Sequence, residues 1–182
     1  MRLVGRLLKL LAAAVIGVIA AVVLLLFLVM PRMQWNATAH PSAAEKWIAR
    51  YVLGKWVRTN APSQANPITP TAENLQEGER EYNEHCAVCH GLDGTAANRV
   101  GGDFYPPIPR LSKGATFLSD GQLYFILSNG IRMTAMPGFA TRHSADELWK
   151  IILWVRHFPN LSAQERAVIQ ARMREEGGET ER

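Results

Sequence analysis

The sequence predicts an all-α protein, and three observations support this prediction. Helix-start pairs of Ser with Glu or Gln three residues later recur at Ser119, Ser144 and Ser162. No segment alternates apolar and polar residues over the length of a strand. One uncharged apolar stretch, residues 10–30, is long enough to form a helix by itself. We therefore expect an apolar N-terminal helix followed by a helical domain without a sheet.

Residues 10–30 predict a transmembrane anchor, because about 20 apolar residues cross the roughly 30 Å hydrocarbon layer of a bilayer. Residues 1–9 contain three basic residues and no acidic one. The positive-inside rule assigns this stub to the cytoplasm and the rest of the chain to the outer side. The alternative is a cleaved signal peptide, since residues 37–39 are Ala-Thr-Ala, which resembles a cleavage site. The apolar stretch exceeds the usual ~7–15 residues of a signal peptide, which favours the anchor.

The net charge of +4 comes mostly from the cytoplasmic stub. The stub holds three of the 20 Lys and Arg residues, which leaves 17 basic against 16 acidic residues in the remaining chain. This part has no basic patch interleaved with aromatic residues. We therefore expect no nucleic-acid partner.

Residues 31–70 are expected to form a juxtamembrane helix followed by a proline-rich linker. After Ser42, a suitable N-cap, a stripe of apolar residues recurs at helical spacing. The stripe consists of Trp47, Ile48, Tyr51, Val52 and Trp56. It fits a helix in the membrane interface with its rings at headgroup depth, and it fits equally a helix packed on the soluble domain. Residues 59–71 predict an extended linker that lets the following domain swing.

Residues 71–159 are expected to form the globular domain, with residues 160–182 as a C-terminal tail helix. Thr71 can cap a first helix that runs to about residue 84. Further helices are expected after Ser119 and Ser144. The segment between the first two helices is rich in Gly and Pro. A loop this long in so small a domain needs something to wrap around.

Both cysteines of the chain lie in the motif Cys86-Ala-Val-Cys89-His90. A structural zinc site would need a second pair of ligands at regular spacing, and the other histidines are scattered. A thioredoxin-like dithiol would follow a strand, and none is expected here. A disulfide between the two cysteines would close a very short loop and stabilise little. The remaining interpretation is covalent attachment of a c-type haem through Cys86 and Cys89, with His90 as an iron ligand. His85 is then the last turn of the helix that leads to Cys86.

The chain resembles the class I monohaem cytochromes c over about residues 71 to 159. The resemblance rests on CAVCH near the start of the domain, IPRL in the loop, MPGF before the last core helix, and Gly78 with Tyr82 ahead of the haem motif. The segments NGIRMTAMPGF and HSADELWKIILWVRHF are similar to the bacterial periplasmic branch, which includes many membrane-tethered proteins. The resemblance implies a cytochrome c fold wrapped around one covalently bound haem c and its iron, preceded here by the single transmembrane helix.

The resemblance also implies roles for residues outside the haem motif. Met136 matches the distal iron ligand, and Met133 is a competing candidate that lacks a following proline. Pro109 matches the proline whose carbonyl accepts a hydrogen bond from the axial histidine. Because the loop is longer than in many relatives, two other prolines could take this part, namely Pro106 and Pro107. Leu111 would contact the haem.

Two further groups of residues have expected roles. By the same resemblance, Gly78 and Tyr82 pack against the C-terminal core helix, near Ile151 and Trp154. Three arginines could each pair with a haem propionate or stay solvated, namely Arg99, Arg110 and Arg132.

His and Met ligation fills both axial positions of the iron, so the resemblance implies an electron carrier and not an enzyme, with no small-molecule substrate. We expect a single-pass protein of the bacterial cytoplasmic membrane whose haem domain lies in the periplasm and exchanges single electrons with other redox proteins. The alternative is an integral haem c subunit that relays electrons within a larger respiratory or photosynthetic complex. A third class, an enzyme or gas sensor, requires an open iron site without Met136.

Overall fold

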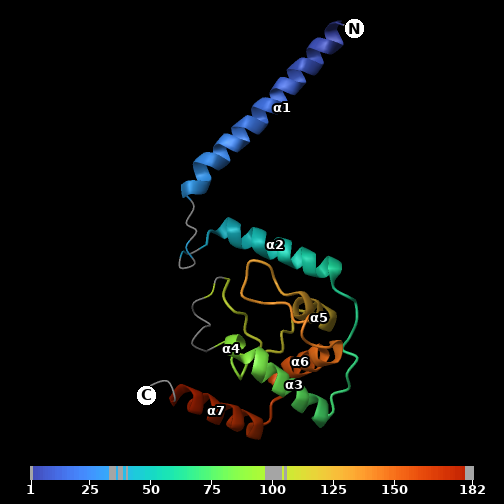
Figure 1. Ribbon diagram of the computed structural model, residues 1–182, viewed down its shortest axis with the longest axis vertical. Helices are drawn as coiled ribbons and strands as arrows, with labels where there is room; N and C mark the ends of the chain where they lie inside the picture. Colours follow the sequence, from blue (N-terminus) through green and yellow to red (C-terminus); the bar gives the residue numbers. More distant parts are fainter. Residues whose placement is uncertain are drawn as a thin grey trace. The chain divides into compact units, whose positions relative to one another are not determined.

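The computed structural model describes residues 2–32, 36, 39, 41–96, 104 and 106–178 (Figure 1). These residues form helices and connecting segments, and no strand occurs among them. The all-α class expected from the sequence is confirmed. The chain divides into two compact units, Met1–Ala39 and His40–Arg182, and each is described by itself.

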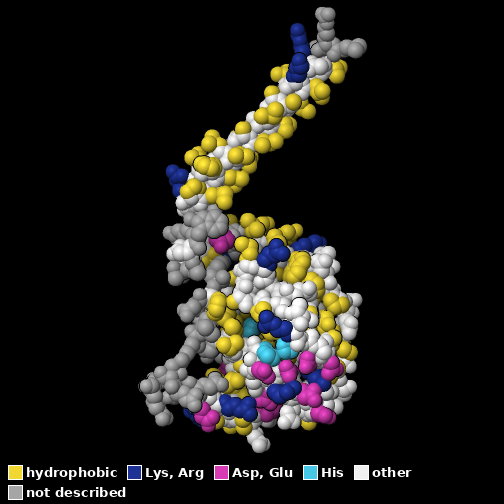
Figure 2. Space-filling view, in the orientation of Figure 1, with side chains coloured by type: hydrophobic (Ala, Val, Ile, Leu, Met, Phe, Trp, Pro, Cys, Tyr) yellow, Lys and Arg dark blue, Asp and Glu magenta, His cyan; other side chains and the backbone are white. Residues whose placement is uncertain are grey.

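The first unit is dominated by one long helix. α1 spans Arg2–Val29 and is followed by a 3-10 turn, η1, at Met30–Arg32. The segment Val4–Arg32 is long and apolar enough to cross a membrane, and its apolar side chains are exposed (Figure 2). The helix begins well before residue 10, because the Arg, Lys and Leu residues that precede the apolar stretch are good helix formers and continue the helix toward the N-terminus. Ala37 and Thr38 of the possible cleavage site lie outside the described residues.

The second unit is built on two helices that cross closely, α3 (Ala72–His85) and α6 (Ala145–His157). At the crossing, Gly78 lies so near the backbone of α6 that an added Cβ would overlap the Lys150 carbonyl. One turn further along α3, Tyr82 is fully buried and meets Phe158 edge to face, with ring centroids 5.2 Å apart. The expected packing of Gly78 on the C-terminal core helix, near Trp154, is therefore confirmed, whereas the aromatic contact of Tyr82 is with Phe158, just after that helix.

The remaining long helices of this unit begin where the sequence predicts their caps. α5 (Asp120–Asn129) starts with a capping box at Ser119, and α6 starts with a second one at Ser144. The tail helix α7 (Ala163–Gly178) follows Ser162, whose hydroxyl accepts a hydrogen bond from a backbone N–H of the first turn. These caps are local interactions between residues three apart, which is why the sequence predicts the helix starts well.

α2 (Ala43–Asn60) carries the apolar stripe, and the two ends of the stripe have different surroundings. Trp56 packs against Phe125 of α5, with ring centroids 4.7 Å apart. Trp47 stacks on Tyr51 of the same helix at 5.6 Å, and both rings are exposed. The C-terminal end of the stripe therefore contacts α5 at the surface of the domain, although Trp56 stays partly exposed, whereas the rings at the N-terminal end are exposed.

Residues 61–70 connect α2 to α3 along an extended path that is fixed to the domain. The Asn66 backbone N–H donates to Asp120 Oδ2 at 3.0 Å, and the Asn66 side chain donates to a backbone carbonyl of α6 at 2.8 Å. Pro62 lies so close to α5 that a Cβ added to Gly121 would overlap the Pro62 carbonyl. These contacts differ from the freely swinging linker expected from composition. Composition does not reveal that one residue, Asn66, joins this segment to α5 through its backbone and to α6 through its side chain.

Replacing Gly78 with Ala is expected to destabilise the domain, because the new Cβ would overlap the Lys150 carbonyl and lie 3.3 Å from Trp154 Cβ. The helices would have to separate, and we expect the free energy of unfolding to fall by roughly 2–3 kcal/mol. Chemical denaturation of the purified protein, followed by circular dichroism, measures this loss.

Gly54→Ala in α2 is the matched control, because its Cβ would meet the end of the flexible Arg58 side chain at 3.0 Å. We expect unchanged stability or a gain of up to about 1 kcal/mol, since Ala favours helix over Gly. Equal losses from the two substitutions would contradict the tight crossing at Gly78.

Candidate haem-binding site

The Cys-x-x-Cys-His motif forms a short helix directly after α3. α3 ends at His85, and α4 spans Ala87–His90 with Cys86 at its start. The His90 backbone N–H donates to the Cys86 carbonyl at 2.8 Å. Both cysteines and the histidine are thus presented by one helical turn. This is the arrangement in which two thiols can add to one haem while the histidine reaches its iron.

The Cys86 thiol is buried beside α3 and is protonated at neutral pH. Burial raises its pKa to about 12, and the neighbouring Cys89 and Glu81 add to the effect. A reactive dithiol has a lowered pKa instead. The environment of Cys86 therefore differs from that of a redox-active dithiol.

His90 is buried and oriented by one hydrogen bond. Its Nδ1–H donates a hydrogen bond to the Pro109 carbonyl oxygen, with 3.0 Å between the two heavy atoms. Burial lowers the pKa of His90, and this outweighs the opposite effect of the Pro109 carbonyl. The imidazole is therefore neutral near pH 7, with its proton on Nδ1 and with Nε2 available to a metal. Of the three prolines considered in this loop, the structure brings Pro109 to His90.

The loop that carries Pro109 is held against the haem motif by Gly94. The backbone N–H groups of Leu111 and Ser112 donate to the Gly94 carbonyl at 2.6 and 2.9 Å. Gly94 has a φ of 70°, and a Cβ there would lie 2.8 Å from the Ser112 nitrogen, so a side chain is not tolerated. Leu111 is partly buried and packs against the core. The loop therefore returns to the motif at the point where Pro109 meets His90.

Tyr82 connects the core to the turn that follows the haem motif. Its hydroxyl donates to the Gly91 carbonyl at 2.8 Å. Burial raises the pKa of Tyr82 far above its usual range, and the nearby Cys86 and Asp93 add to this. The hydroxyl therefore stays protonated and keeps donating at any ordinary pH.

The far end of the loop is held by the guanidinium group of Arg156 in α6. It donates to the backbone carbonyls of Gly114, Ala115 and Leu118 at 2.6 to 3.0 Å. It also pairs with Asp120 at 2.8 Å. One side chain of the core helix thus satisfies three carbonyls of the segment that leads into α5.

Sequence reasoning missed Arg156 and considered other arginines instead. Arg110 and Arg132 are exposed, and Arg99 lies outside the described residues. The available signal was an arginine within the otherwise apolar segment LWVRHF, where an unpaired charge would be costly. Its partners could not be deduced, because every residue has a backbone carbonyl and the sequence does not show which of them Arg156 meets.

The structure separates the two candidate methionine ligands. Met133 is 91% exposed and has a positive φ of 61°. Met136 is partly buried and packs against the core. The Ile131 N–H donates to the Met136 carbonyl at 3.0 Å, and the Met136 N–H donates to the Thr134 hydroxyl at 3.1 Å. The segment around Met136 is therefore a closed turn that points this residue, rather than Met133, toward the interior.

Comparison with known proteins identifies this domain. Residues 73–155 match the family model described as cytochrome c oxidase, cbb3-type, subunit III. This part of the chain is an all-α haem c domain. More narrowly, it is a class I c-type cytochrome domain, and its cofactor is a covalently bound haem c with its iron. Such a domain carries electrons and is not itself catalytic.

The residues at the site fit this cofactor. Two free cysteines on one helical turn and a neutral histidine whose Nδ1 is engaged by a carbonyl are the donors that a c-type haem requires. The carbonyl on His90 Nδ1 is the outer contact that usually orients a metal-binding imidazole. Cys86, Cys89 and His90 would hold the haem.

Two curated relatives share part of the chain. Thiosulfate dehydrogenase of Stutzerimonas stutzeri is 31% identical over 86 residues, which cover 41% of this chain and 28% of that protein. Quinohemoprotein alcohol dehydrogenase ADH IIB of Pseudomonas putida is 26% identical over 103 residues, which cover 56% of this chain and 14% of that protein. The matches thus span less than a third of either relative, and the relatives' catalytic activities are not assigned to this chain.

Two solved structures are also similar to the chain. A reducing HAO-like protein complex of Kuenenia stuttgartiensis is 25% identical, with a TM-score of 0.45, over 53% of this chain and 50% of that one. Cytochrome CL of Methylophaga aminisulfidivorans is 18% identical, with a TM-score of 0.36, over 74% of this chain and 83% of that one. The domain assignment rests on the sequence matches and not on these weaker structural ones.

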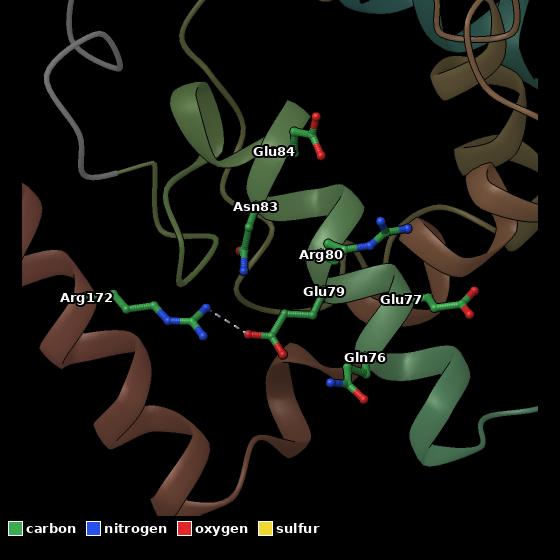
Figure 3. Close-up of a pocket in the computed structure, with 7 residues that line it drawn as sticks. All are labelled: Gln76, Glu77, Glu79, Arg80, Asn83, Glu84 and Arg172. Carbon is green, nitrogen blue, oxygen red and sulfur yellow. Dashed lines mark hydrogen bonds and ion pairs between the residues drawn. The ribbon is translucent and has the colours of Figure 1, made fainter.

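A separate hollow lies between α3 and α7 (Figure 3). Arg172 of α7 reaches toward Glu79 of α3, with 3.5 Å between Nη1 and Oε1. Charged side chains of both signs line it, among them Glu77 and Arg80. No haem-motif residue lines this hollow, so it is distinct from the cofactor site.

Arg156→Lys is expected to loosen the segment from Gly114 to Leu118, because one ammonium group cannot reach three carbonyls and Asp120 at once. We expect the free energy of unfolding to fall by roughly 2–3 kcal/mol, measured by urea denaturation with circular dichroism. Arg110→Lys, in the same loop but exposed, is the control and should change stability by less than about 0.5 kcal/mol. A control variant as unstable as Arg156→Lys would argue against the described contacts.

Proposed function

We propose that this chain is a membrane-tethered cytochrome c that transfers single electrons between redox partners on the periplasmic side of the bacterial cytoplasmic membrane. The observation that carries the proposal is the orientation of His90. Its Nδ1 is engaged by the Pro109 carbonyl, so Nε2 is available to the iron. α1, which is long and apolar enough to cross a membrane, supports the tether.

In this proposal the chain supplies both axial ligands of the iron, His90 through Nε2 and Met136 through its thioether. The partial burial of Met136 supports this residue as the second iron ligand, and the 91% exposure of Met133 argues against Met133 in that role. Leu111, two residues after Pro109 and partly buried, is placed to contact the haem. A His and Met pair leaves no open position for a substrate and raises the reduction potential relative to a pair of histidines.

The bound haem supplies an iron that accepts and releases one electron. The rest of the task falls to the chain. Cys86 and Cys89 keep the cofactor attached, and Pro109 keeps the His90 ring in one orientation. Gly94 and Arg156 hold the two described ends of the long loop through hydrogen bonds to its backbone. Anchored surroundings suit electron transfer, because little rearrangement then accompanies the reaction.

Three features support a position at the outer face of the membrane. Cytochrome c domains are generally extracytoplasmic, and the basic residues at the start of α1 favour a cytoplasmic N-terminus. At the beginning of α2, the exposed rings of Trp47 and Tyr51 lie beside Lys46 and Arg50. Aromatic rings next to cations are typical of residues at the headgroup level of a bilayer. We infer that this end of α2 rests on the membrane.

Met136→Ala is expected to leave the haem attached but to open one axial position of the iron. The ferrous variant should then bind carbon monoxide rapidly at neutral pH, as measured by stopped-flow absorbance on the full chain in detergent. Met133→Ala is the matched control and should resemble the unmodified protein, because Met133 is exposed. Rapid carbon monoxide binding by the unmodified protein, or by Met133→Ala alone, would contradict ligation by Met136 and the simple carrier function.

A second candidate function is a fixed haem c subunit that relays electrons inside a larger complex. The name of the matching family, subunit III of a cbb3-type cytochrome c oxidase, favours it. The exposed face of α2 would then contact other subunits rather than lipid.

Gentle detergent extraction followed by native electrophoresis and haem staining separates the two functions. A free carrier is expected to migrate alone, at the size of one 20.2 kDa chain with its detergent. Haem stain that migrates with a large assembly at constant stoichiometry would contradict the free carrier and support the relay subunit.

A further inference from the structure

Two histidines and a carboxylate far apart in sequence meet at the end of α3. Glu81 and His85 lie one turn apart on this helix, and His143 reaches them from the segment just before α6. The Glu81 Oε2 atom lies 3.7 Å from His85 Nε2 and 3.6 Å from His143 Nδ1. One atom from each residue falls within 4.8 Å of the other two.

The three side chains face one another, but Glu81 forms no hydrogen bond with either histidine. Both distances to Glu81 Oε2 are too long for a hydrogen bond. The other oxygen, Oε1, accepts from Arg80 at 2.7 Å. The side chains of Glu81 and His143 are only 8% and 9% exposed, so water has limited access to them. Among the described residues, a buried carboxylate oxygen and two imidazole nitrogens thus surround a common point.

The surroundings hold the two rings in place. The His85 and His143 rings meet edge to face, with centroids 4.5 Å apart. Phe139 lies against both of them, at 6.4 Å from His85 and 5.7 Å from His143. An apolar wall beside the two imidazoles restricts their rotation, which lowers the entropy that a ligand would have to remove. The cluster is therefore partly ordered before any ligand binds.

We propose that Glu81, His85 and His143 form a binding site for a divalent first-row transition metal such as zinc, separate from the haem iron. Two imidazoles and a carboxylate are a known ligand set for zinc, with water in the fourth position. In a tetrahedral site with bonds near 2.1 Å, ligand atoms lie roughly 3.4 Å apart. The distances of 3.6 and 3.7 Å need only small side-chain adjustments to reach this value. Glu84, whose carboxylate lies 3.8 Å from His85 Nε2, is the nearest alternative to the water.

The position of the site suggests what a bound metal would do. His85 directly precedes Cys86, and His143 belongs to the same connection between α5 and α6 as Met136. A metal bound to both histidines would therefore join the haem motif to the segment that carries the candidate distal ligand. By mass action, a ligand that binds only the folded chain stabilises it. The proposal does not depend on electron transfer, because it requires only the folded chain.

Isothermal titration with zinc chloride tests the site directly, using the full haem-loaded chain in detergent, purified without a polyhistidine tag. We expect one saturable zinc site per chain. His85→Gln and His143→Gln should each weaken zinc binding roughly tenfold or more, since a ligand is lost. His157→Gln is the matched control and should bind zinc as the unmodified chain does. His157 also faces a carboxylate, Glu165, at 3.0 Å, but lies outside the cluster.

Two further results keep the test decisive. Zinc should raise the melting temperature of the unmodified chain but not that of His143→Gln. His143 is distant in sequence from the haem motif, whereas His85 directly precedes Cys86, so the haem spectrum of His143→Gln should be unaltered even if His85→Gln impairs haem attachment. No saturable binding up to about millimolar zinc would overturn the proposal. Equal affinity in the unmodified chain and both histidine variants would overturn it as well.

Discussion

The close crossing of α3 and α6 at Gly78 is the contact on which the rest of the domain depends. The Lys150 carbonyl of α6 occupies the space where any residue other than glycine at position 78 would carry its Cβ. Lys150 reinforces the crossing at its edge by pairing with Glu77 of α3 and Asp146 of α6, both at 2.6 Å. The free energy that stabilises the folded domain comes mainly from burial of the apolar side chains at this crossing, including Tyr82 and Trp154.

The crossing of α3 and α6 sets the positions of the segments that form the haem site. α3 runs from Gly78 directly into Cys86, so the position of the crossing sets the position of the haem motif. α6 carries Arg156, which holds the end of the long loop, and α6 begins just after the segment that contains Met136. Pro109 reaches His90 because both ends of its loop are tied to this frame. The site is therefore assembled from pieces that are each anchored to the same pair of helices.

The sequence predicts the local features of this structure and misses the long-range polar ones. Helix starts at Ser119 and Ser144 were predictable because their capping partners lie three residues away. The haem motif was predictable because its three donors share one helical turn. The contacts of Asn66 and Arg156 were not, because their partners, which are backbone carbonyls and the Asp120 carboxylate, lie in distant segments. The meeting of Glu81 and His85 with His143 was likewise hidden, since it depends on how the segment before α6 folds back onto α3.

The central claim is that one haem is held between His90 and Met136. Proton–carbon NMR of the ferrous protein, labelled with carbon-13 at its methionine methyl groups, tests it most directly. A methionine that binds the iron places its methyl group over the porphyrin, where the ring current moves the resonance far upfield. The account predicts one such resonance among the six methionines, absent from a Met136→Leu variant and retained in Met133→Leu. A spectrum with no upfield methyl resonance, or one that disappears only in Met133→Leu, would contradict it.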